Sequence, residues 1–468
     1  MMMRIRLSAC TLLLTLCGCA PYKYHSIPVS PPILANTLEA RSLDDAGLRV
    51  WMKDAAGYDP SWPLSTWDLK ALTLAAYYFN PQMDVARAQA ASADAAIKTA
   101  AMKPNPGVGA DAGYETSPES PYLLGFNFSW PIETAGKRGY RIASAQHLSE
   151  ASRIAVGEAA WAVRSKVRAA LVYLIFAEKA VAELRAQVAS QSRYADLLEA
   201  RFRAGEIPLP EVTTARIDLT NLRQALETAQ GQVGTARAAL AAAIGIPLSG
   251  LAGKAVTWAG VEELPAPYAL PATSVRVAAV ANRLDVQRAL AEYEAAQARL
   301  QLEVARQYPD VDLGPGYAFE EGIHLISLQF GTVLPIRNHN EGPIAEAAAQ
   351  RKAAGAQLLA TQSTVIAQTD QALAQYDAAY AVLKIAQNSL TQVQAQEQTA
   401  EQWLKSGETD QLAAASAEIQ VAIAERTRLD ALRQTQIALG LLEDALQRPL
   451  GSSTVAALPK IAPRQKEF

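Results

Sequence analysis

The chain has 468 residues, a formal net charge of −3 and only three cysteines. This charge balance argues against a nucleic-acid-binding protein, for which a basic surface is expected. The cysteines, Cys10, Cys17 and Cys19, all lie near the N-terminus, so the rest of the chain offers neither a disulfide nor a thiol metal ligand.

The N-terminus has the pattern of a bacterial export signal. Two arginines precede an apolar run at 7–16, which is too short to span a bilayer as a helix of about 20 residues. The run ends in the tetrad LCGC at 16–19, which resembles the lipobox of bacterial lipoproteins. The resemblance implies that Cys19 carries a lipid. It also implies sorting to the outer membrane, because Pro21 rather than an aspartate lies two places after Cys19. The alternative is an ordinary signal peptide with incidental cysteines.

Positions 84–146 and 285–350 are two copies of one pattern. Each copy runs through an alanine-rich helical stretch, a proline break, two alternating strands around a small polar loop, and a very long helix. The chain is therefore predicted to be a tandem duplication. We expect the following division: a lipoprotein signal peptide at 1–18, an N-terminal extended segment at 19–62, a first repeat at 63–250, a linker at 251–269, a second repeat at 270–450 and a C-terminal tail at 451–468.

Four strands are predicted, because large apolar residues alternate with small or polar ones at 108–114, 124–130, 311–319 and 326–331. Such alternation, with aromatic residues near strand ends, fits a transmembrane β-barrel with lipid outside and water inside. A half-buried hairpin in a soluble sheet would show the same alternation. Four strands cannot close a barrel, and an open edge in lipid leaves backbone groups unsatisfied. We therefore expect the chain to oligomerise, and three copies would supply twelve strands.

The remaining sequence predicts long helices. From about 139 to 203 there is no proline, and residues that favour helices predominate, so the helix is expected to be on the order of 100 Å long. Its apolar residues follow the 3-4 spacing of a coiled coil. A soluble coiled-coil scaffold would explain the helices but not the strands between them. The predicted helices are 139–203 and 211–244 in the first copy, and 346–405 and 410–446 in the second.

Five motifs make the chain resemble the TolC-like outer membrane factor family over nearly all of residues 60–450. They are KPNPGVGADAGY at 103–114, WPIETAGKRGYRIASA at 130–145, RFRAGEIPLPEVTTARIDL at 201–219, YPDVDLGPGY at 308–317 and LPIRNHNEGPIAEA at 334–347. The GKR at 136–138, together with LPIRNHNEG at the matching place in the second copy, is most similar to the heavy-metal efflux group typified by CzcC.

The resemblance implies a mainly α fold with a β-barrel part. It implies a homotrimer, in which a twelve-stranded barrel in the outer membrane continues into a long periplasmic α-helical barrel. Such a protein is the exit duct of a tripartite efflux system, with a periplasmic adaptor and an inner-membrane RND-type transporter as partners. A type I secretion duct is the alternative within the family. A lipid-anchored structural coiled-coil protein of the periplasm is the alternative of another class.

The helical reversals carry the functional residues that the resemblance implies. In the family, the tip glycines and their flanks meet the adaptor, although a glycine can also merely end a helix. Family apertures carry two aspartates six and nine positions after the second tip glycine, and here those positions are Ala413 and Ser416. The remaining acidic candidates for the aperture are Glu211 and Asp410. The tip residues are Arg203, Gly205, Glu206, Lys405, Gly407 and Glu408.

A basic cluster, Lys137, Arg138 and Arg141, opens the first long helix. Cations at a helix start oppose the helix macrodipole, so they need another partner. Lipid phosphate at the membrane interface or the nearby Glu133 would serve, and a solvated charged turn is the alternative. No enzyme, cofactor or metal site is expected, because the four histidines are scattered without paired spacing and no phosphate loop or nucleophile elbow occurs.

Overall fold

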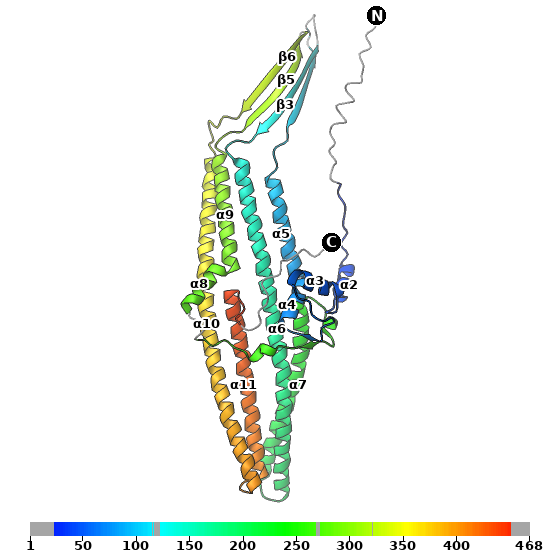
Figure 1. Cartoon of the computed structure of the whole chain (residues 1–468), viewed down its shortest axis with the longest axis vertical. Helices are drawn as coiled ribbons and strands as arrows, with labels where there is room; N and C mark the ends of the chain where they lie inside the picture. The colour runs from blue at the N-terminus through cyan, green and yellow to red at the C-terminus, as the bar shows by residue number, and fades with distance from the viewer. Residues whose placement is uncertain (1–22, 115, 117–121, 268–271, 321, 451–468) are drawn as a thin grey trace.

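A computed structural model describes residues 23–114, 116, 122–267, 272–320 and 322–450. The molecule is strongly elongated, with a β-sheet at one end, long helices along its axis and two helical reversals at the other end (Figure 1). Over the described residues, no helix combines the length and the apolar character needed to cross a membrane.

The order of elements confirms the predicted duplication. In each copy, two helices precede two strands and two longer helices follow them. The first copy comprises α4 (Leu69–Phe79), α5 (Pro81–Ala100), β2 (Gly107–Tyr114), β3 (Tyr122–Ile132), α6 (Lys137–Arg203) and α7 (Leu209–Ile244). The second comprises α8 (Ala272–Asn282), α9 (Leu284–Ala305), β5 (Val311–Glu320), β6 (Ile323–Thr332), α10 (Glu341–Ser406) and α11 (Gln411–Leu446).

The longest helices owe their length to uninterrupted helix-forming sequence. Helix α6 has 67 residues and α10 has 66, so at 1.5 Å per residue each extends about 100 Å. Prolines occur only in the first turns, where the missing N–H would have no helical partner in any case. Glycine in the left-handed conformation follows the last turn of α6, α7 and α10.

The four long strands form one antiparallel sheet in the order β2-β3-β5-β6, which joins the two copies through the β3–β5 pair. Val108 pairs with Phe128, and Phe126 pairs with Tyr317. At Gly314 a side chain is impossible, because a Cβ atom would collide with the carbonyl oxygen of Phe128 on β3. The backbones of β3 and β5 therefore approach closely only because this position is glycine.

The register gives the sheet one apolar and one mostly polar face, as the alternation predicts. Exceptions near the loops are Leu123, Ile323 and Leu325, which share the polar face. The apolar face is widely exposed in the single chain, with Leu328 at 78% and Ile326 at 84% of full exposure. It carries Tyr114, Leu124, Phe126, Phe128, Trp130, Leu313, Tyr317, Phe319, Ile326, Leu328 and Phe330. The other face carries Gly109, Asp111, Asn127, Ser129, Asp312, Gly316, Ser327 and Gln329.

The main core lies around α4, midway along the molecule, and corrects one expectation. Helix α4 is buried on all sides between α6, α7 and the N-terminal part of the chain. The segment 19–62 is not extended throughout, since it contains α2 (Pro31–Glu39) and α3 (Ala46–Ala56). Asp45 caps α3 by accepting a hydrogen bond from the amide of Gly47 at 2.7 Å. Leu48 and Met52 then bury one face of α3 in the core.

The linker between the repeats crosses this core. Its short strand β4 (Ala255–Val256) pairs in parallel with β1 (Thr66–Trp67), which precedes α4. Two single turns, η1 (Leu248–Leu251) and η2 (Ala259–Glu262), lie on either side of β4. The linker is thus part of a belt around the middle of the helices, together with α2, α3, α4 and α8 (Figure 1).

Candidate functional site

The junction between strands and helices is built around Asp310, directly before β5. Its Oδ1 accepts hydrogen bonds from Nζ of Lys137 at 2.7 Å and from the amide of Thr134 at 2.9 Å. Partial burial acts to raise the pKa of Asp310, but these hydrogen bonds outweigh it and hold the pKa below its usual range. The start of α6 in the first repeat is therefore fixed to the strand of the second repeat.

Arg138 and Arg141 contact the C-terminal end of α5. Nε of Arg138 donates to the carbonyl of Ala101 at 2.7 Å, and Nε of Arg141 donates to the carbonyl of Ala100 at 3.0 Å. The negative end of the α5 dipole lies at these carbonyls. The two cations are therefore unfavourable for α6, which they begin, but they stabilise the end of α5. Arg141 also forms an ion pair with Glu133. A contact of this cluster with lipid phosphate stays a prediction.

The second repeat closes its junction with an amide instead of a cation. Asn340 precedes α10 in the left-handed conformation, with φ of +64°, where Gly136 precedes α6 with φ of +72°. Its Nδ2 donates to the carbonyl of Glu303, in the last turn of α9, at 2.7 Å. In both repeats the start of the long helix thus holds the end of the shorter one.

Both tips have the same backbone conformation. Gly205 and Gly407 adopt φ of +77° and +78°, and the amides of Glu206 and Glu408 reach back to carbonyls five residues earlier, at 3.0 and 2.8 Å. This is the Schellman ending of a helix. No atom of the described chain lies within 4 Å of a Cβ added at either glycine. The two tips are open surfaces.

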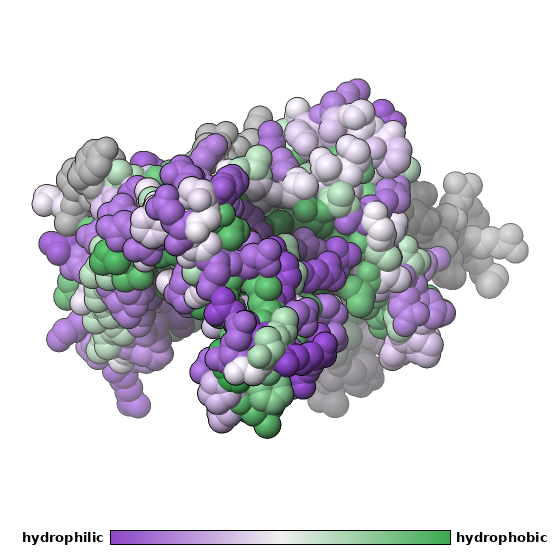
Figure 2. Space-filling model, turned by 90° about the horizontal axis from the view of Figure 1, so that it is seen from below, coloured by the Kyte–Doolittle hydropathy of each residue, from purple (hydrophilic) through white to green (hydrophobic). Residues whose placement is uncertain are grey.

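The charged tip residues are exposed and only partly engaged. Arg203 pairs with Glu199 at 2.6 Å, and Glu206 approaches Arg201 at 3.9 Å. Lys405 and Glu408 are exposed beside Gly407. Seen from this end the surface of the molecule is largely hydrophilic, with hydrophobic patches between (Figure 2).

Asp410 joins the two helical hairpins of one chain. Its Oδ2 accepts from Nη2 of Arg201 at 2.5 Å, and its Oδ1 caps α11 by accepting from the amide of Ala413 at 2.8 Å. The amide of Ala413, then Arg201, hold the pKa of Asp410 below its usual range. Leu412 also packs against the small core of the first tip. Glu211, the other aperture candidate, is exposed in the first turn of α7.

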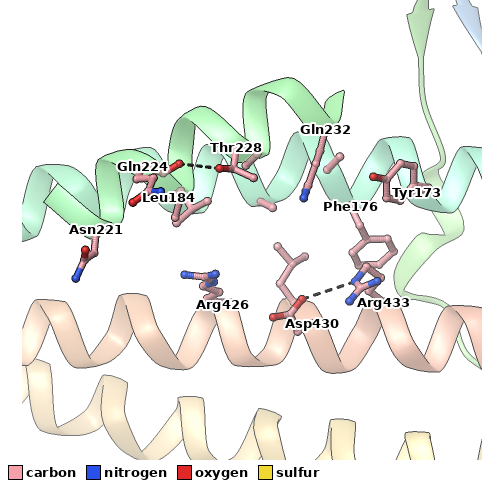
Figure 3. A pocket seen from close by; sticks show the side chains of 15 residues that line it. Tyr173, Phe176, Leu184, Asn221, Gln224, Thr228, Gln232, Arg426, Asp430 and Arg433 are labelled. Atoms are coloured by element: carbon pink, nitrogen blue, oxygen red, sulfur yellow. Dashed lines mark hydrogen bonds and ion pairs between the residues drawn. The ribbon is translucent and has the colours of Figure 1, made fainter. Parts of the chain in front are cut away.

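A groove separates the hairpins above this contact. It has a volume of about 520 Å³ and lies between α6, α7 and α11. In Figure 3 polar side chains of α7 face charged side chains of α11 across it, and the ring of Phe176 from α6 lies beside Arg433. The facing residues are Asn221, Gln224 and Thr228 on one side and Arg426, Asp430 and Arg433 on the other.

A buried ionic cluster lies between α6 and α11, beyond the end of the groove that is nearer the sheet. The sequence analysis did not identify it. Nη2 of Arg164 lies 3.0 Å and Nε of Arg168 lies 3.2 Å from Oε2 of Glu443, and all three side chains are at most 5% exposed. Burial, partly offset by Glu443, lowers the pKa of Arg168. Two arginines four apart within an apolar helical stretch were the available signal. Removing one partner of such a pair is strongly destabilising, because a buried charge is left uncompensated.

Carboxylates of three helices gather between the buried cluster and the tips. Burial and the neighbouring Glu425 raise the pKa of Glu183, which faces α11 from α6. Burial, with Glu401 and Glu418 close by, raises the pKa of Glu397 on α10. Glu418 is paired with Arg193 of α6. These residues form an acidic zone that the sequence analysis did not identify, because they come together only through packing.

Cys19, the predicted lipid attachment site, lies outside the described residues. The other predicted residues fall into two groups at opposite ends of the helices. The basic cluster is at the sheet end, and the tip and aperture residues are at the reversals.

Comparison with known proteins bears on this architecture. A family model described as "Outer membrane efflux protein" matches residues 76–246 and 275–447, one match for each repeat. The cobalt-zinc-cadmium resistance protein CzcC of Cupriavidus metallidurans is 26% identical over 315 residues, which cover 67% of this chain and 72% of the relative.

Solved structures show the same fold. The match to the outer membrane protein VceC of Vibrio cholerae has a TM-score of 0.64 at 20% identity. It covers 81% of this chain and 95% of the VceC chain. The match to the CmeC outer membrane channel of Campylobacter jejuni has a TM-score of 0.63 at 15% identity. It covers 92% of this chain and 95% of the CmeC chain. The predicted fold, mainly helical with a β-barrel part, is thereby confirmed.

The two roles of Asp410 can be separated. Asp410→Ala removes the helix cap and the ion pair, whereas Arg201→Gln removes only the ion pair. A cap contributes about 1 kcal/mol, so we expect hydrogen exchange at the amide of Ala413 to be roughly fivefold faster in Asp410→Ala and little changed in Arg201→Gln. Because the folded pKa is lowered, the stabilisation is present above about pH 4 and is lost as the pH falls through the lowered value. Equal exchange in both variants would contradict this division.

Proposed function

Because the chain belongs to the outer membrane efflux protein family, we propose that it is the exit duct of a tripartite efflux system. Three copies would close a twelve-stranded barrel in the outer membrane and continue it as a helical barrel through the periplasm. Substrate would enter from an RND-type inner-membrane transporter and a periplasmic adaptor. The family consists of outer membrane channels, which are not enzymes.

The sheet is the observation that carries this proposal. Its apolar face is exposed in the single chain, and each large apolar side chain left in water forgoes about 1.5–3 kcal/mol relative to burial. Among the described strands, β2 and β6 each have one edge without a partner. Lipid would cover the face, and pairing β6 of one copy with β2 of the next would satisfy the edges. A periplasmic coiled-coil protein would leave both features without a role.

The relationship to a metal-resistance protein favours metal ions as the exported solute. The relative CzcC is named as a cobalt-zinc-cadmium resistance protein, and the GKR at 136–138 resembles that group. In this structure Lys137 and Arg138 of that motif hold the strand–helix junction. The motif therefore has a structural role, and it supports the relationship to the CzcC group without indicating a solute. The proposal of a metal cargo rests on the similarity to CzcC.

The tips are the proposed docking surface for the adaptor. Both reversals are exposed, have open space at glycine and lie at the end of the molecule farthest from the sheet (Figure 1). The missing side chains leave the backbone of 205–206 and 407–408 accessible to a partner. The exposed Lys405 and Glu408 would add polar contacts at the rim.

Arginine substitutions on the two faces of the sheet test the barrel. Phe128→Arg and Leu328→Arg would place a charge against lipid, at about 2–4 kcal/mol near the midplane. Asn127→Arg and Gln329→Arg, one position away, would place it on the polar face. We expect the first pair to abolish trimers that resist detergent and conductance in planar bilayers, and the second pair to retain both. Equal behaviour of the pairs would refute the proposed barrel.

Bulk at the tip glycines tests the docking surface. Gly205→Trp and Gly407→Trp would block an adaptor without contacting the sheet, so trimer yield should persist while resistance and cross-linking to the adaptor are lost. Gly205→Ala and Gly407→Ala are matched controls, because alanine imposes the same left-handed strain without the bulk. Resistance and cross-linking that survive in the double tryptophan variant would place the adaptor elsewhere.

The lipid anchor is tested by labelling. Radiolabelled palmitate is expected in the wild-type protein and absent from Cys19→Ser, because the labelled diacylglycerol would be attached through the thiol of this residue. Cys17→Ser is the control and should retain the label. Label that persists in Cys19→Ser would show that the tetrad at 16–19 is not a lipobox.

A further inference from the structure

Three potential metal ligands meet between α6 and α9, near the upper end of the helices. Nδ1 of His147 lies 3.1 Å from Oε2 of Glu294 and 3.8 Å from Oε2 of Glu150. One ligand atom from each residue falls within 4.8 Å of the others. His147 and Glu150 are three positions apart on α6, so they share one face of that helix. Glu294 comes from the other repeat, so the spacing of residues along the sequence does not reveal this cluster.

The ring nitrogen of His147 is the second observation. Nδ1 is inaccessible to solvent, and within the described structure it has no hydrogen-bond partner. The carboxylates of Glu294 and Glu150 lie near this nitrogen, but neither forms a hydrogen bond with it. A buried polar nitrogen without a partner is costly, and a metal ion bound to its lone pair would satisfy it.

The nearby basic side chains of Arg288 and Arg153 are paired with other carboxylates, so Glu150 and Glu294 remain available to bind a cation. Arg288 of α9 is paired with Glu158 and Glu292, at 2.9 and 2.8 Å. Asp94 of α5, on another side of α6, is held by Arg153 at 3.0 Å. For Glu150 and Glu294, the ion pairs of the described residues include one basic partner, His147. With a neutral imidazole the cluster carries two negative charges, which suits a divalent cation.

We propose that His147, Glu150 and Glu294 bind a divalent transition-metal ion of the Zn²⁺ class. Imidazole nitrogen with carboxylate oxygens is a donor set that such ions prefer. Ligand bonds of about 2.0–2.2 Å in a tetrahedral arrangement separate the donor atoms by about 3.4 Å, close to the spacings of 3.1 and 3.8 Å found here. Three protein ligands leave one position for water.

The proposed site lies between helices that are already fixed to each other. Oγ of Ser144 donates to the carbonyl of Ala295 at 3.2 Å, one turn from His147 and beside Glu294. Farther along the same interface, Arg288 of α9 pairs with Glu158 of α6. A bound ion would therefore join the first repeat to the second without a large rearrangement. The ion would stay bound between α6 and α9 whichever solute the proposed duct exports.

Equilibrium binding to the full-length protein, purified in detergent and freed of metal with a chelator, tests this site. Titration with ZnCl₂ at pH 7.5 in a calorimeter should show one saturable site per chain. His147→Ala and Glu294→Gln should weaken the affinity by at least roughly tenfold, since each removes a ligand. His339→Ala is the matched control, because it removes an exposed histidine near the junction, and it should bind as the wild type does.

Thermal unfolding gives an independent measurement. Zn²⁺ should raise the unfolding midpoint of the wild type and of His339→Ala, and should leave that of His147→Ala unchanged. Absence of saturable binding in the wild type, or equal binding in His147→Ala, would overturn the site. Neither readout depends on efflux, so a failure here would leave the proposed duct untouched, and the reverse also holds.

Discussion

The hydrogen-bonded contact between Lys137 and Asp310 fixes the geometry on which the rest of the molecule depends. A sheet and helices of about 100 Å must meet at a defined angle, and a small error at the junction would displace the tips by many ångströms. Asp310 connects β5 to the start of α6, while Arg138 and Arg141 connect α6 to the end of α5. Three elements from two repeats are therefore held at one point before any coiled-coil packing begins.

The two repeats are similar in path but differ in their charged contacts. Gly136 and Asn340 occupy the same conformation before the long helices, yet cations hold the first junction and an amide holds the second. The buried cluster of Arg164, Arg168 and Glu443 connects α6 to α11. Since the Lys137–Asp310 contact and this cluster each join residues of both copies, duplication was followed by divergence that made the halves dependent on each other. The hairpins meet again at Arg201 and Asp410, with the polar groove between these two connections.

The features that could be predicted from the sequence are those with a local period. Alternation of side chains predicted the four strands and their two faces, and unbroken helix-forming sequence predicted α6 and α10, because both signals need only neighbouring residues. Asp310, Glu443 and Glu294 could not be assigned, because their partners belong to the other repeat and nothing local distinguishes them. The extended segment expected at 19–62 was an error of a different kind. Asp45 and the left-handed Gly57 are ordinary cap residues that mark α3.

The sheet order has a consequence for how the chain reaches its native state. Strand β3 pairs with β5, so Leu124 must find Phe319 after both long helices of the first repeat have been synthesised between them. Contacts between such distant positions form slowly, whereas helical hairpins form early from nearby residues. The pairing of β3 with β5 is consequently slow to form, and until it forms the apolar strands are exposed in an aqueous compartment, where they are prone to aggregate. Because the order of events follows from connectivity, it would hold for any sequence with this topology.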